Sequence, residues 1–499
     1  MKRIMYTVLL AATFMASCSK SYLDKTPYTA TALNSAITGE SDMLVALTGT
    51  YSQLRSYYLF GTANAMKGDI MGDNTYVTTS NSGRYTSMNN FSFTTADSYA
   101  YYCWYYNYIA IKYANTVINA SVASSTNADQ YRGEAYAIRA LCLFDLVRNF
   151  GHPYTVAPDD PGVPIITTFN QDTLPARSSV RAVYAQVLAD LDKAYTLMTT
   201  YRGTAYLSKY AAKALQARVY QNMGDWTNAK TAALDVINNS GWVMLASTSY
   251  VAATGSLGSV YTASTYSPGG YWSSATVQSS TKNETMFEIA SDVTNNNGYE
   301  SIGSLFLQIG GGYGDILALD GLYNLYSSTD VRRGLVPNAG TYRSGQAGNT
   351  YLCYKYPNAF GTSDRDDTKL IRLSDIILIA AEAYYNTPDE TNALTYLNKV
   401  AKQRDASFAG YTSTGTQVLE DILTERRKEL AFEGSRFWDL VRLKRSWTKI
   451  SNPNPLKTVS VNAANNSNAS FSKTAPLVYP IPQTEILANT NMVQNPEYQ

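Results

Sequence analysis

Few residues of this 499-residue chain have the types and spacing that catalysis requires. The single histidine, His152, precedes Pro153 in an expected loop, so zinc motifs that need two histidines are excluded. Acidic residues cluster at Asp364, Asp366 and Asp367. A glycoside hydrolase needs two carboxylates held roughly 5 to 10 Å apart, whereas an aspartate run in a polar loop more often forms a solvated turn. These residues therefore favour a protein that is not an enzyme.

Two further acids, Asp69 and Asp73, suggest a cation site in the region from residue 61 to 98. A calcium site needs a dense group of oxygen ligands, which two carboxylates alone do not provide. We therefore expect both to be solvated residues of a long loop, and we predict no metal ligands and no cofactor. The sequence leaves open whether a structural calcium ion is bound.

Tyrosine is the compositional outlier, with 42 residues. Its ring has a flat apolar face and a polar tip, which suits stacking on sugars while amides and arginines bond the sugar hydroxyls. Many of these rings must still belong to the core. From loops and one helix entrance we select seven candidate glycan contacts: Asn74, Tyr76, Tyr101, Tyr271, Trp272, Tyr299 and Tyr313.

The most charged stretch, TERRKELAFEGSRFWDLVRLK, runs from residue 424 to 444. Glu425, Glu429 and Glu433 recur at helical spacing, so three carboxylates share a stripe that needs facing cations. Gly434 is expected to separate two helices, and Ser435 to cap the second. The expected cations are Arg426, Arg427, Lys428, Arg436 and Arg442. Since apolar residues accompany the charges, a structural network is favoured over a solvated face.

A helical scaffold must position these residues. Apolar periodicity predicts a first helix within residues 22–60, a helix after the aromatic run at 99–108, and an amphipathic helix over 131–150. The region 61–98 is expected to be loop. Composition rich in Ser, Thr, Gly, Asn and Tyr predicts a loop-rich insertion over about 241–365.

An internal repeat supports the scaffold. At an offset of 164 residues, Ala217 aligns with Ala381 and Asp225 with Asp389, with further identities around them. Each copy reads as a helix, a tight turn and a second helix with alanine on its packing face, which is the tetratricopeptide pattern. Looser helix pairs are expected near 104–149 and 418–446.

The first seventeen residues read as an export signal, with Lys2 and Arg3 before an apolar run that is short for a membrane span. The run ends at Met15-Ala16-Ser17-Cys18, which resembles the lipobox of bacterial lipoproteins. Cleavage there would leave Cys18 as the acylated first residue and hold the chain to a membrane through lipid. An ordinary secretory signal is the alternative.

Several blocks together resemble the SusD/RagB-type nutrient-binding lipoproteins of Bacteroidetes. They are ERRKELAFEGSRFWDLVRLK, GEAYAIRALCLFDLVRNFG at 133–151, and the closing Tyr479-Pro480-Ile481-Pro482 with Gln494-Asn495-Pro496-Glu497-Tyr498, where Glu497 replaces the common glycine. The resemblance implies a mostly α fold of tetratricopeptide-like helix pairs, forming a right-handed superhelical scaffold with a loop-rich subdomain.

The resemblance also implies a domain division and a function. Residues 18–499 form a single domain, with the scaffold at about 30–240 and 366–450, the ligand-facing insertion at 241–365 and an extended tail at 451–499. The expected role is a cell-surface lipoprotein of the outer membrane that captures an oligosaccharide or polysaccharide. It would deliver this glycan to a SusC-like TonB-dependent transporter. In the family, aromatics near the entrance of the helix after residue 99 contribute to ligand binding, which favours Tyr101 over Tyr105.

Other functions stay open to different degrees. A net charge of +1 gives no electrostatic case for nucleic acid. Cys103, Cys142 and Cys353 form neither a zinc motif nor a full disulfide framework. A peptide-binding or adhesive surface lipoprotein on the same scaffold is the alternative function, and a glycoside hydrolase is the least favoured. The sequence does not encode which glycan is bound.

Overall fold

The computed structural model describes residues 37–168, 170, 172–255, 266–267, 270–272, 282–308, 311–340, 350–357, 366–449, 459–462 and 477–499. The export signal, Cys18 and Asp364 lie outside these ranges. Within them, every helix is too short or too polar to cross a bilayer.

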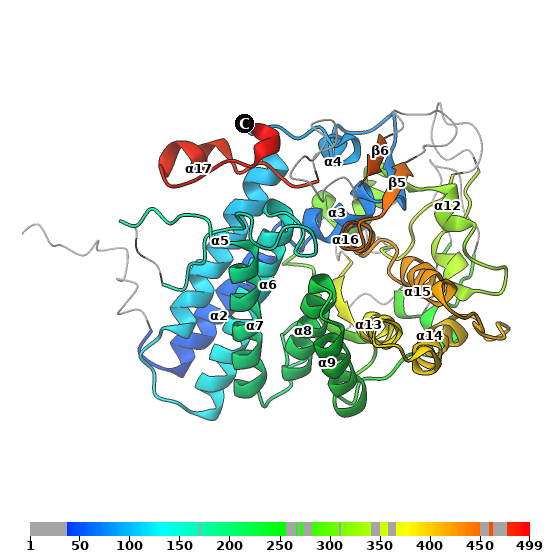
Figure 1. Ribbon diagram of the computed structural model, residues 1–499, viewed down its shortest axis with the longest axis horizontal. Coiled ribbons are helices and arrows are strands. Elements are labelled where there is room, and N and C mark those ends of the chain that lie inside the picture. The colour runs from blue at the N-terminus through cyan, green and yellow to red at the C-terminus, as the bar shows by residue number, and fades with distance from the viewer. Residues whose placement is uncertain are drawn as a thin grey trace, which may run out of the picture.

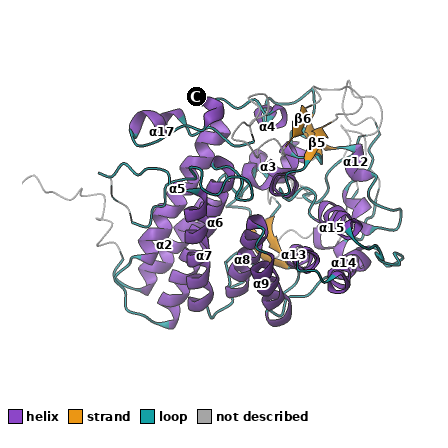
Figure 2. Cartoon of the chain, in the orientation of Figure 1, coloured by secondary structure: helices purple, strands orange, loops and turns teal. Residues whose placement is uncertain are grey.

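Nine longer helices form the scaffold of the described structure (Figures 1 and 2). They are α2 (Glu40–Leu54), α5 (Ser98–Ile118), α6 (Thr126–Phe150), α7 (Val180–Leu197), α8 (Lys209–Met223), α9 (Trp226–Asn239), α13 (Leu373–Asn386), α14 (Glu390–Arg404) and α15 (Thr416–Glu429). Consecutive members of the series from α5 to α9 pack on one another, and α9 packs on α13 and α13 on α14. The prediction of a mostly α fold with tetratricopeptide-like pairs is confirmed.

Shorter elements join and cover these helices. The short α-helices are α3 (Ala63–Met71), α4 (Thr86–Asn90), α10 (Ser247–Tyr250), α11 (Ile302–Phe306), α12 (Asp320–Tyr323), α16 (Arg436–Arg442) and α17 (Gln483–Ala488). Single 3-10 turns are η3 (Gly270–Trp272), η4 (Gly298–Glu300), η6 (Val331–Leu335) and η8 (Pro496–Tyr498). The strands are β1 (Thr75–Val77), β2 (Thr285–Ile289), β3 (Ile316–Ala318), β4 (Thr368–Arg372), β5 (Ser446–Lys449) and β6 (Val459–Asn462). They form three antiparallel pairs, β1 with β3, β2 with β4 and β5 with β6.

The internal repeat is a pair of equivalent helix hairpins. Helix α8 begins at Lys209 and α13 at Leu373, which is the predicted offset of 164 residues. The second helices are capped in the same way, because Asp225 accepts from the backbone N–H of Asn228 and Asp389 from that of Asn392. A carboxylate at the N-cap satisfies an N–H group that the helix cannot pair. The repeat therefore extends to the hydrogen bonds that begin each helix.

The region from 61 to 98, expected to be loop, contains a buried helix instead. Every residue of α3 except Asn64 is buried, including Lys67 and Asp69. A Cβ added at Gly68 would lie 1.8 Å from the carbonyl oxygen of Gly434, so the two backbones touch. Asp69 accepts from the N–H groups of Phe432, at 2.9 Å, and Gly434, at 2.5 Å. Contact with the distant 430–434 turn, rather than local propensity, accounts for this helix.

The charged stretch differs in detail from its prediction. Helix α15 ends at Glu429, five residues before Gly434, and the turn contains Phe432 in the left-handed region at φ 65°. Ser435 makes no capping hydrogen bond to α16. The helix ends early because the turn backbone is held by Asp69 against α3.

Most cations that face the glutamate stripe come from distant parts of the chain, which corrects the expected pairing. Glu429 contacts the guanidinium groups of Arg332, Arg372 and Arg404 at 3.0 Å each. Glu433 lies 2.5 Å from Lys355 Nζ and 2.7 Å from Arg372. Glu425 pairs with Arg332 at 2.7 Å, and only Lys428 joins it from the same stretch. All of these residues but Lys428 and the half-buried Glu433 are buried, and together we call them the ionic core.

The remaining arginines of the stretch serve other acids. Arg426 of α15 bonds Asp375 on α13 and Asp439 on α16, so it ties α15 to both of these helices. Arg427 and Arg436 both pair with Asp73. We had expected Asp69 and Asp73 to be solvated loop residues. Instead, both bind the 424–444 stretch.

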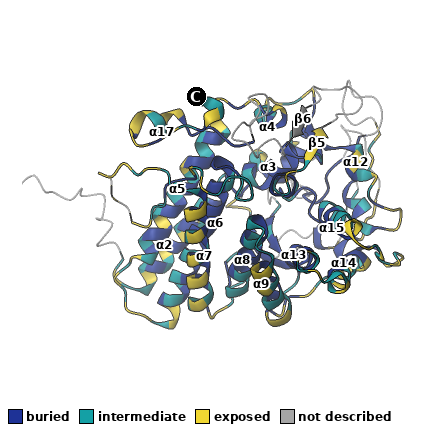
Figure 3. Cartoon of the chain, viewed as in Figure 1, coloured by how far each residue is buried: buried dark blue, intermediate teal, exposed yellow. Residues whose placement is uncertain are grey.

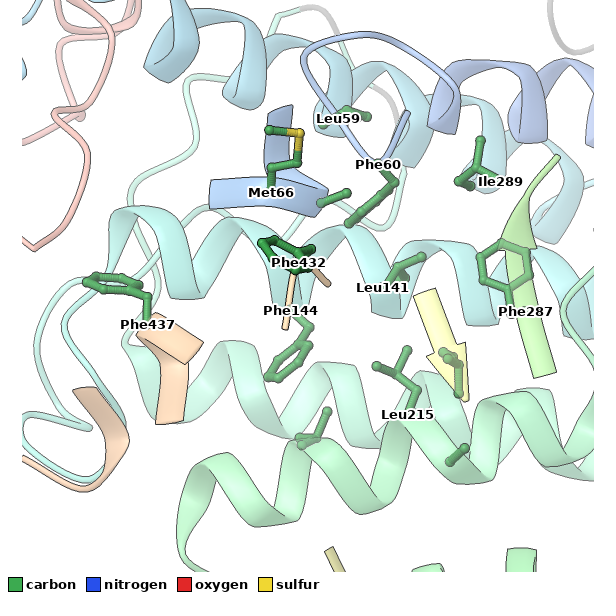
Figure 4. Packing of buried hydrophobic residues seen from close by; sticks show 14 of the residues in the cluster. Leu59, Phe60, Met66, Leu141, Phe144, Leu215, Phe287, Ile289, Phe432 and Phe437 are labelled. Carbon is green, nitrogen blue, oxygen red and sulfur yellow. The ribbon is translucent and has the colours of Figure 1, made fainter. Parts of the chain in front are cut away.

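Apolar residues fill the space between the layers. Figure 3 shows the buried face of each scaffold helix, with exposed residues on the outer sides of α7 and α9. Figure 4 shows one hydrophobic cluster in which Phe60 and Met66, near and on α3, approach Phe432 and the α6 residues Leu141 and Phe144. The ionic core thus lies within a continuous apolar interior.

The C-terminal segment is anchored to the end of α6. Tyr479 N–H donates to Asn149 O at 2.7 Å, and Asn495 Nδ2 donates to Phe150 O at 3.0 Å. His152 stands between Asp160, 2.7 Å from Nδ1, and Glu497, 3.0 Å from Nε2. Burial alone would lower the pKa of His152, but the hydrogen bonds and charges of these two carboxylates outweigh it and raise the pKa.

We predict that Glu429→Ala destabilises the protein by about 3 to 5 kcal/mol, because three buried guanidinium groups lose a shared partner. Glu420→Ala is the matched control, since Glu420 pairs with Arg445 at the surface and such pairs contribute about 1 kcal/mol or less. Urea unfolding of both variants gives the comparison. Equal losses in the two variants would show that the ionic core contributes no more than a surface pair.

We predict that stability falls at alkaline pH through His152. A histidine whose folded pKa is raised contributes stability that is full below its unfolded pKa, about 6.5, and that is lost as pH rises through the folded pKa. Urea unfolding at about pH 6 and about pH 9 measures the change. In His152→Gln the part of this change that comes from the histidine should vanish, and an unchanged pH profile would contradict the assignment.

Candidate functional site

Four of the seven predicted glycan contacts lie in the interior. The side chain of Asn74 donates to Asp69 at 2.8 Å and accepts from Arg427 at 2.8 Å. Tyr76 is buried in β1, opposite Leu317 of β3. Both residues therefore hold α3 and β1 in place and have no surface for a ligand.

Tyr271 and Trp272 are buried beside the ionic core. The Trp272 ring lies 4.7 Å from Lys355 Nζ and 5.3 Å from the Arg372 guanidinium carbon. Tyr271 lies 5.0 Å from Lys369 Nζ, and its hydroxyl bonds Thr285 Oγ1. Aromatic faces attract cations, and the attraction is stronger away from water. Their expected role as sugar platforms is corrected to one of supporting buried cations.

The other three candidates, Tyr101, Tyr299 and Tyr313, lie at the surface. Tyr101 is half-buried on the first turn of α5, and the Tyr299 side chain is 49% exposed. Tyr313 is half-buried and carries the Arg84 guanidinium carbon 4.0 Å from its ring centre. These three rings mark the region in which a ligand can be contacted.

Helix α5 presents a group of tyrosines near its N-terminus. Asp97 begins the helix by accepting from the N–H groups of Tyr99, at 2.9 Å, and Ala100, at 3.1 Å. Residues four apart lie on the same face, so Tyr101 stacks with Tyr105 at 6.0 Å and Tyr102 with Tyr106 at 5.9 Å between ring centres. The two stripes touch edge to face, which makes one aromatic surface.

Tyr58 extends this surface from the segment after α2. Its ring stacks on Tyr102 at 4.2 Å with an interplanar angle of 27°. Burial raises the pKa of Tyr58, and the adjacent Tyr102 and Tyr99 phenols and the Glu300 carboxylate raise it further. The phenol therefore stays neutral near pH 7, where it both donates and accepts hydrogen bonds.

A charged group stands next to the tyrosines. Arg84 pairs with Glu300 at 2.5 Å and donates to the Tyr313 hydroxyl at 3.1 Å. The neighbouring Tyr85, in the left-handed region at φ 58°, stacks on Tyr99 of α5 at 5.0 Å. This stack fixes Arg84 beside the helix. The side chains of Arg84 and Glu300 keep 26% and 35% of their surface exposed, so their outer atoms can reach a ligand.

The loop that carries Tyr299 is tied to the same place. Thr62 Oγ1 donates to Glu300 O at 2.7 Å, and Asn297 Nδ2 donates to Arg55 O at 2.9 Å. A Cβ added at Gly311 would lie 2.8 Å from the Tyr299 ring, so that ring rests against a bare backbone. Four segments of the chain thus meet at one surface, which we call the tyrosine site and define as Tyr58, Arg84, Tyr101, Tyr102, Tyr106, Tyr299, Glu300 and Tyr313.

The residues of the tyrosine site suit the binding of a ligand, and Glu300 is the one carboxylate among them. Its rings offer apolar faces, while Arg84, Glu300 and the phenols offer hydrogen bonds. Of the acids once considered for hydrolysis, Asp367 is buried and accepts from Ser291 N–H at 2.7 Å. In the part of the chain that the structure describes, no three His, Cys, Asp or Glu residues are placed to hold a metal.

Several members of the tyrosine site were missed from the sequence. Tyr102 and Tyr106 belong to the aromatic run that yielded Tyr101, and their i, i+4 spacing was the available signal. Tyr105, set aside in favour of Tyr101, is 44% exposed and stacks on it. Tyr58, Arg84 and Glu300 come from separate loops, and no local pattern marks their meeting.

Comparison with known proteins gives a consistent result. The model of the SusD family matches residues 215–498, and a second family model, described as starch-binding associating with outer membrane, matches residues 21–221. SusD-like protein P38 of Formosa agariphila is 25% identical over 481 residues, which cover 88% of this chain and 90% of that protein.

Solved structures agree with this match. A SusD superfamily protein from Bacteroides vulgatus is 26% identical with a TM-score of 0.78, and the alignment covers 93% of this chain and all of that one. Another, from Bacteroides thetaiotaomicron, is 26% identical with a TM-score of 0.77, over 92% of this chain and all of that one.

We predict that nitration of the folded protein by tetranitromethane separates the two sets of tyrosines. Tyr299 and Tyr105 should be modified early, because their rings are exposed. Tyr271 should stay unmodified until the protein unfolds, because burial raises its pKa well above the ordinary value and keeps reagent away. Peptide mass spectrometry gives the order, and early nitration of Tyr271 would contradict its placement in the interior.

Proposed function

This chain belongs to the SusD family, and on that premise we propose that it captures a glycan at the surface of the outer membrane and passes it to a SusC-like TonB-dependent transporter. The family's character is carbohydrate binding, and the description of the second matching family associates it with starch and the outer membrane. Lipid on Cys18 would hold the chain to that membrane. Such a role requires affinity for the glycan but no catalytic residues.

The observation that carries the proposal is the meeting of stacked tyrosines with the Arg84–Glu300 pair. A sugar ring has apolar faces of C–H groups and an equator of hydroxyls. The faces suit the rings on α5, and the hydroxyls suit a guanidinium donor and a carboxylate acceptor beside them. Rings that already stack on one another lose little conformational freedom on binding, which favours a preformed platform.

The fold supplies the rigidity that such a platform needs. The α5 tyrosines project from a helix packed on α2 and α6. Arg84 is held by its bonds to Glu300 and Tyr313, and Tyr299 by its contact with Gly311. A site on rigid elements keeps its geometry when empty. The tyrosine site is thus suited to retain an extended glycan until the transporter receives it.

We predict that the Tyr102→Ala, Tyr106→Ala double variant weakens glycan binding about tenfold or more, because stacked aromatic contacts are worth about 1 kcal/mol each. Arg84→Met should weaken it while leaving the rings in place. Affinity electrophoresis of the soluble chain in gels containing starch, laminarin, xylan or alginate identifies the glycan, and calorimetry then measures affinity.

Tyr113→Ala is the control for these variants. Tyr113 lies on the same helix and is 38% exposed, but it is about three turns beyond Tyr102. Its removal should leave affinity unchanged. Undiminished binding in the double variant would remove the tyrosine site from the proposal, and binding of peptides alone would favour the other function considered for this scaffold.

A further inference from the structure

A cavity of about 400 Å³ lies against α5. One wall is α5 itself, the second consists of described residues between Pro164 and Pro175, and the third is the end of α17 with the residues that follow it. Figure 1 shows α17 and this segment beside α5. The volume falls within the range of small-molecule sites, roughly 300 to 1,000 Å³.

Hydrogen bonds join the walls of the cavity and fix their positions. Tyr108 and Asn115 of α5 donate to the carbonyls of Pro164 and Ile166, each at 2.9 Å. On the opposite side, Asn489 donates to Pro175 O at 2.8 Å and Asn491 to Leu174 O at 2.8 Å. The cavity is therefore a built feature of the fold and not a gap between loosely packed segments.

The cavity is lined mainly by apolar and aromatic residues. Trp104 and Tyr108 line it from α5, and Lys112 and Glu485 add one charged group from each side. Tyr105 and Leu174, which line it from two different walls, are 44% and 47% exposed. Exposed apolar groups gathered at a concave surface mark a place where something binds.

The cavity is continuous with the tyrosine site. Tyr101, Tyr105, Tyr108 and Lys112 recur at intervals of three or four residues, so they form one stripe of α5. The neighbouring stripe of Tyr102 and Tyr106 touches the first at Tyr101 and Tyr105, edge to face at 4.8 and 5.2 Å. Aromatic surface therefore runs without a break from Tyr58 to Tyr105, and Tyr105 itself lines the cavity.

We infer that this cavity is a second glycan subsite, which takes a distal part of the same chain that the tyrosine site holds. This inference rests on the proposed function. Tyr105 gives the sugar an apolar face, while Lys112 and Glu485 bond its hydroxyls. From Tyr102 to Lys112 the helix rises about 15 Å, so the two subsites together select a glycan of several residues over a disaccharide.

Ala488→Trp tests this inference, because Ala488 is exposed on α17 and lines the cavity, so a bulky ring there fills the space without entering the core. Leu487→Trp is the matched control, since Leu487 is exposed next to it and does not line the cavity. The probes are disaccharides and heptasaccharides from starch, laminarin, xylan and alginate. Calorimetry gives affinity, and hydrogen exchange reports protection of residues 164–175 and 485–492.

We expect the natural chain to bind the heptasaccharide more tightly than the disaccharide. Ala488→Trp should lower the ratio of the two affinities about tenfold. Its affinity for the disaccharide and the affinities of Leu487→Trp should not change. Bound heptasaccharide should protect both cavity walls from exchange, and the disaccharide should not.

Two results would overturn the inference alone. One is a length preference that survives in Ala488→Trp while the Tyr102→Ala, Tyr106→Ala variant loses binding, and the other is absence of protection at the cavity walls. Binding that depends on the cavity but not on those tyrosines would contradict a single chain crossing both subsites. Failure of the chain to bind any of the glycans would overturn the proposed function together with this inference.

Discussion

The rest of the structure depends on the burial of Glu429 among three arginines. A charge removed from water is tolerated only when opposite charges and hydrogen bonds replace its hydration. Arg332 comes from the loop-rich region, Arg372 from the end of β4 and Arg404 from the end of α14. All of these segments must be in place before the Glu429 carboxylate has its full set of partners. The ionic core therefore couples segments that share little regular secondary structure with one another.

The same constraint explains how the chain divides its aromatic residues. Buried guanidinium and ammonium groups are stabilised by aromatic faces on the sides that carboxylates do not cover. Tyr250 and Trp272 make such cation–π contacts with Arg404 and Lys355. Rings used in this way are lost to ligands. The tyrosines near the start of α5 stack on other tyrosines instead, Tyr102 on Tyr58 and Tyr99 on Tyr85. Two populations of tyrosine thus follow from the position of the buried charge.

Much of the scaffold could be predicted because its signals are local. Helix periodicity, an N-cap aspartate and a repeated alanine face act within a few residues, so the equivalence of the α8–α9 and α13–α14 hairpins was readable from sequence. Helix α3 was not readable, since it is only nine residues long, contains Gly68 and is held by contact with the distant Gly434. The tyrosine site was found only in part, because some of its contacts are local and others are not. The Tyr101 region is local, whereas the approach of Arg84 to Glu300 joins residues more than 200 positions apart.

Gly311 determines the orientation of the Tyr299 ring because it has no side chain. Tyr299 leans on its bare backbone, and φ at this residue is 81°, a conformation that glycine adopts with little strain. Any larger residue there would push the ring outward and change the angle it presents. Relatives could therefore acquire preferences for differently shaped glycans by substitution at a position that never touches the glycan. Sequence comparisons restricted to contact residues would overlook such a change.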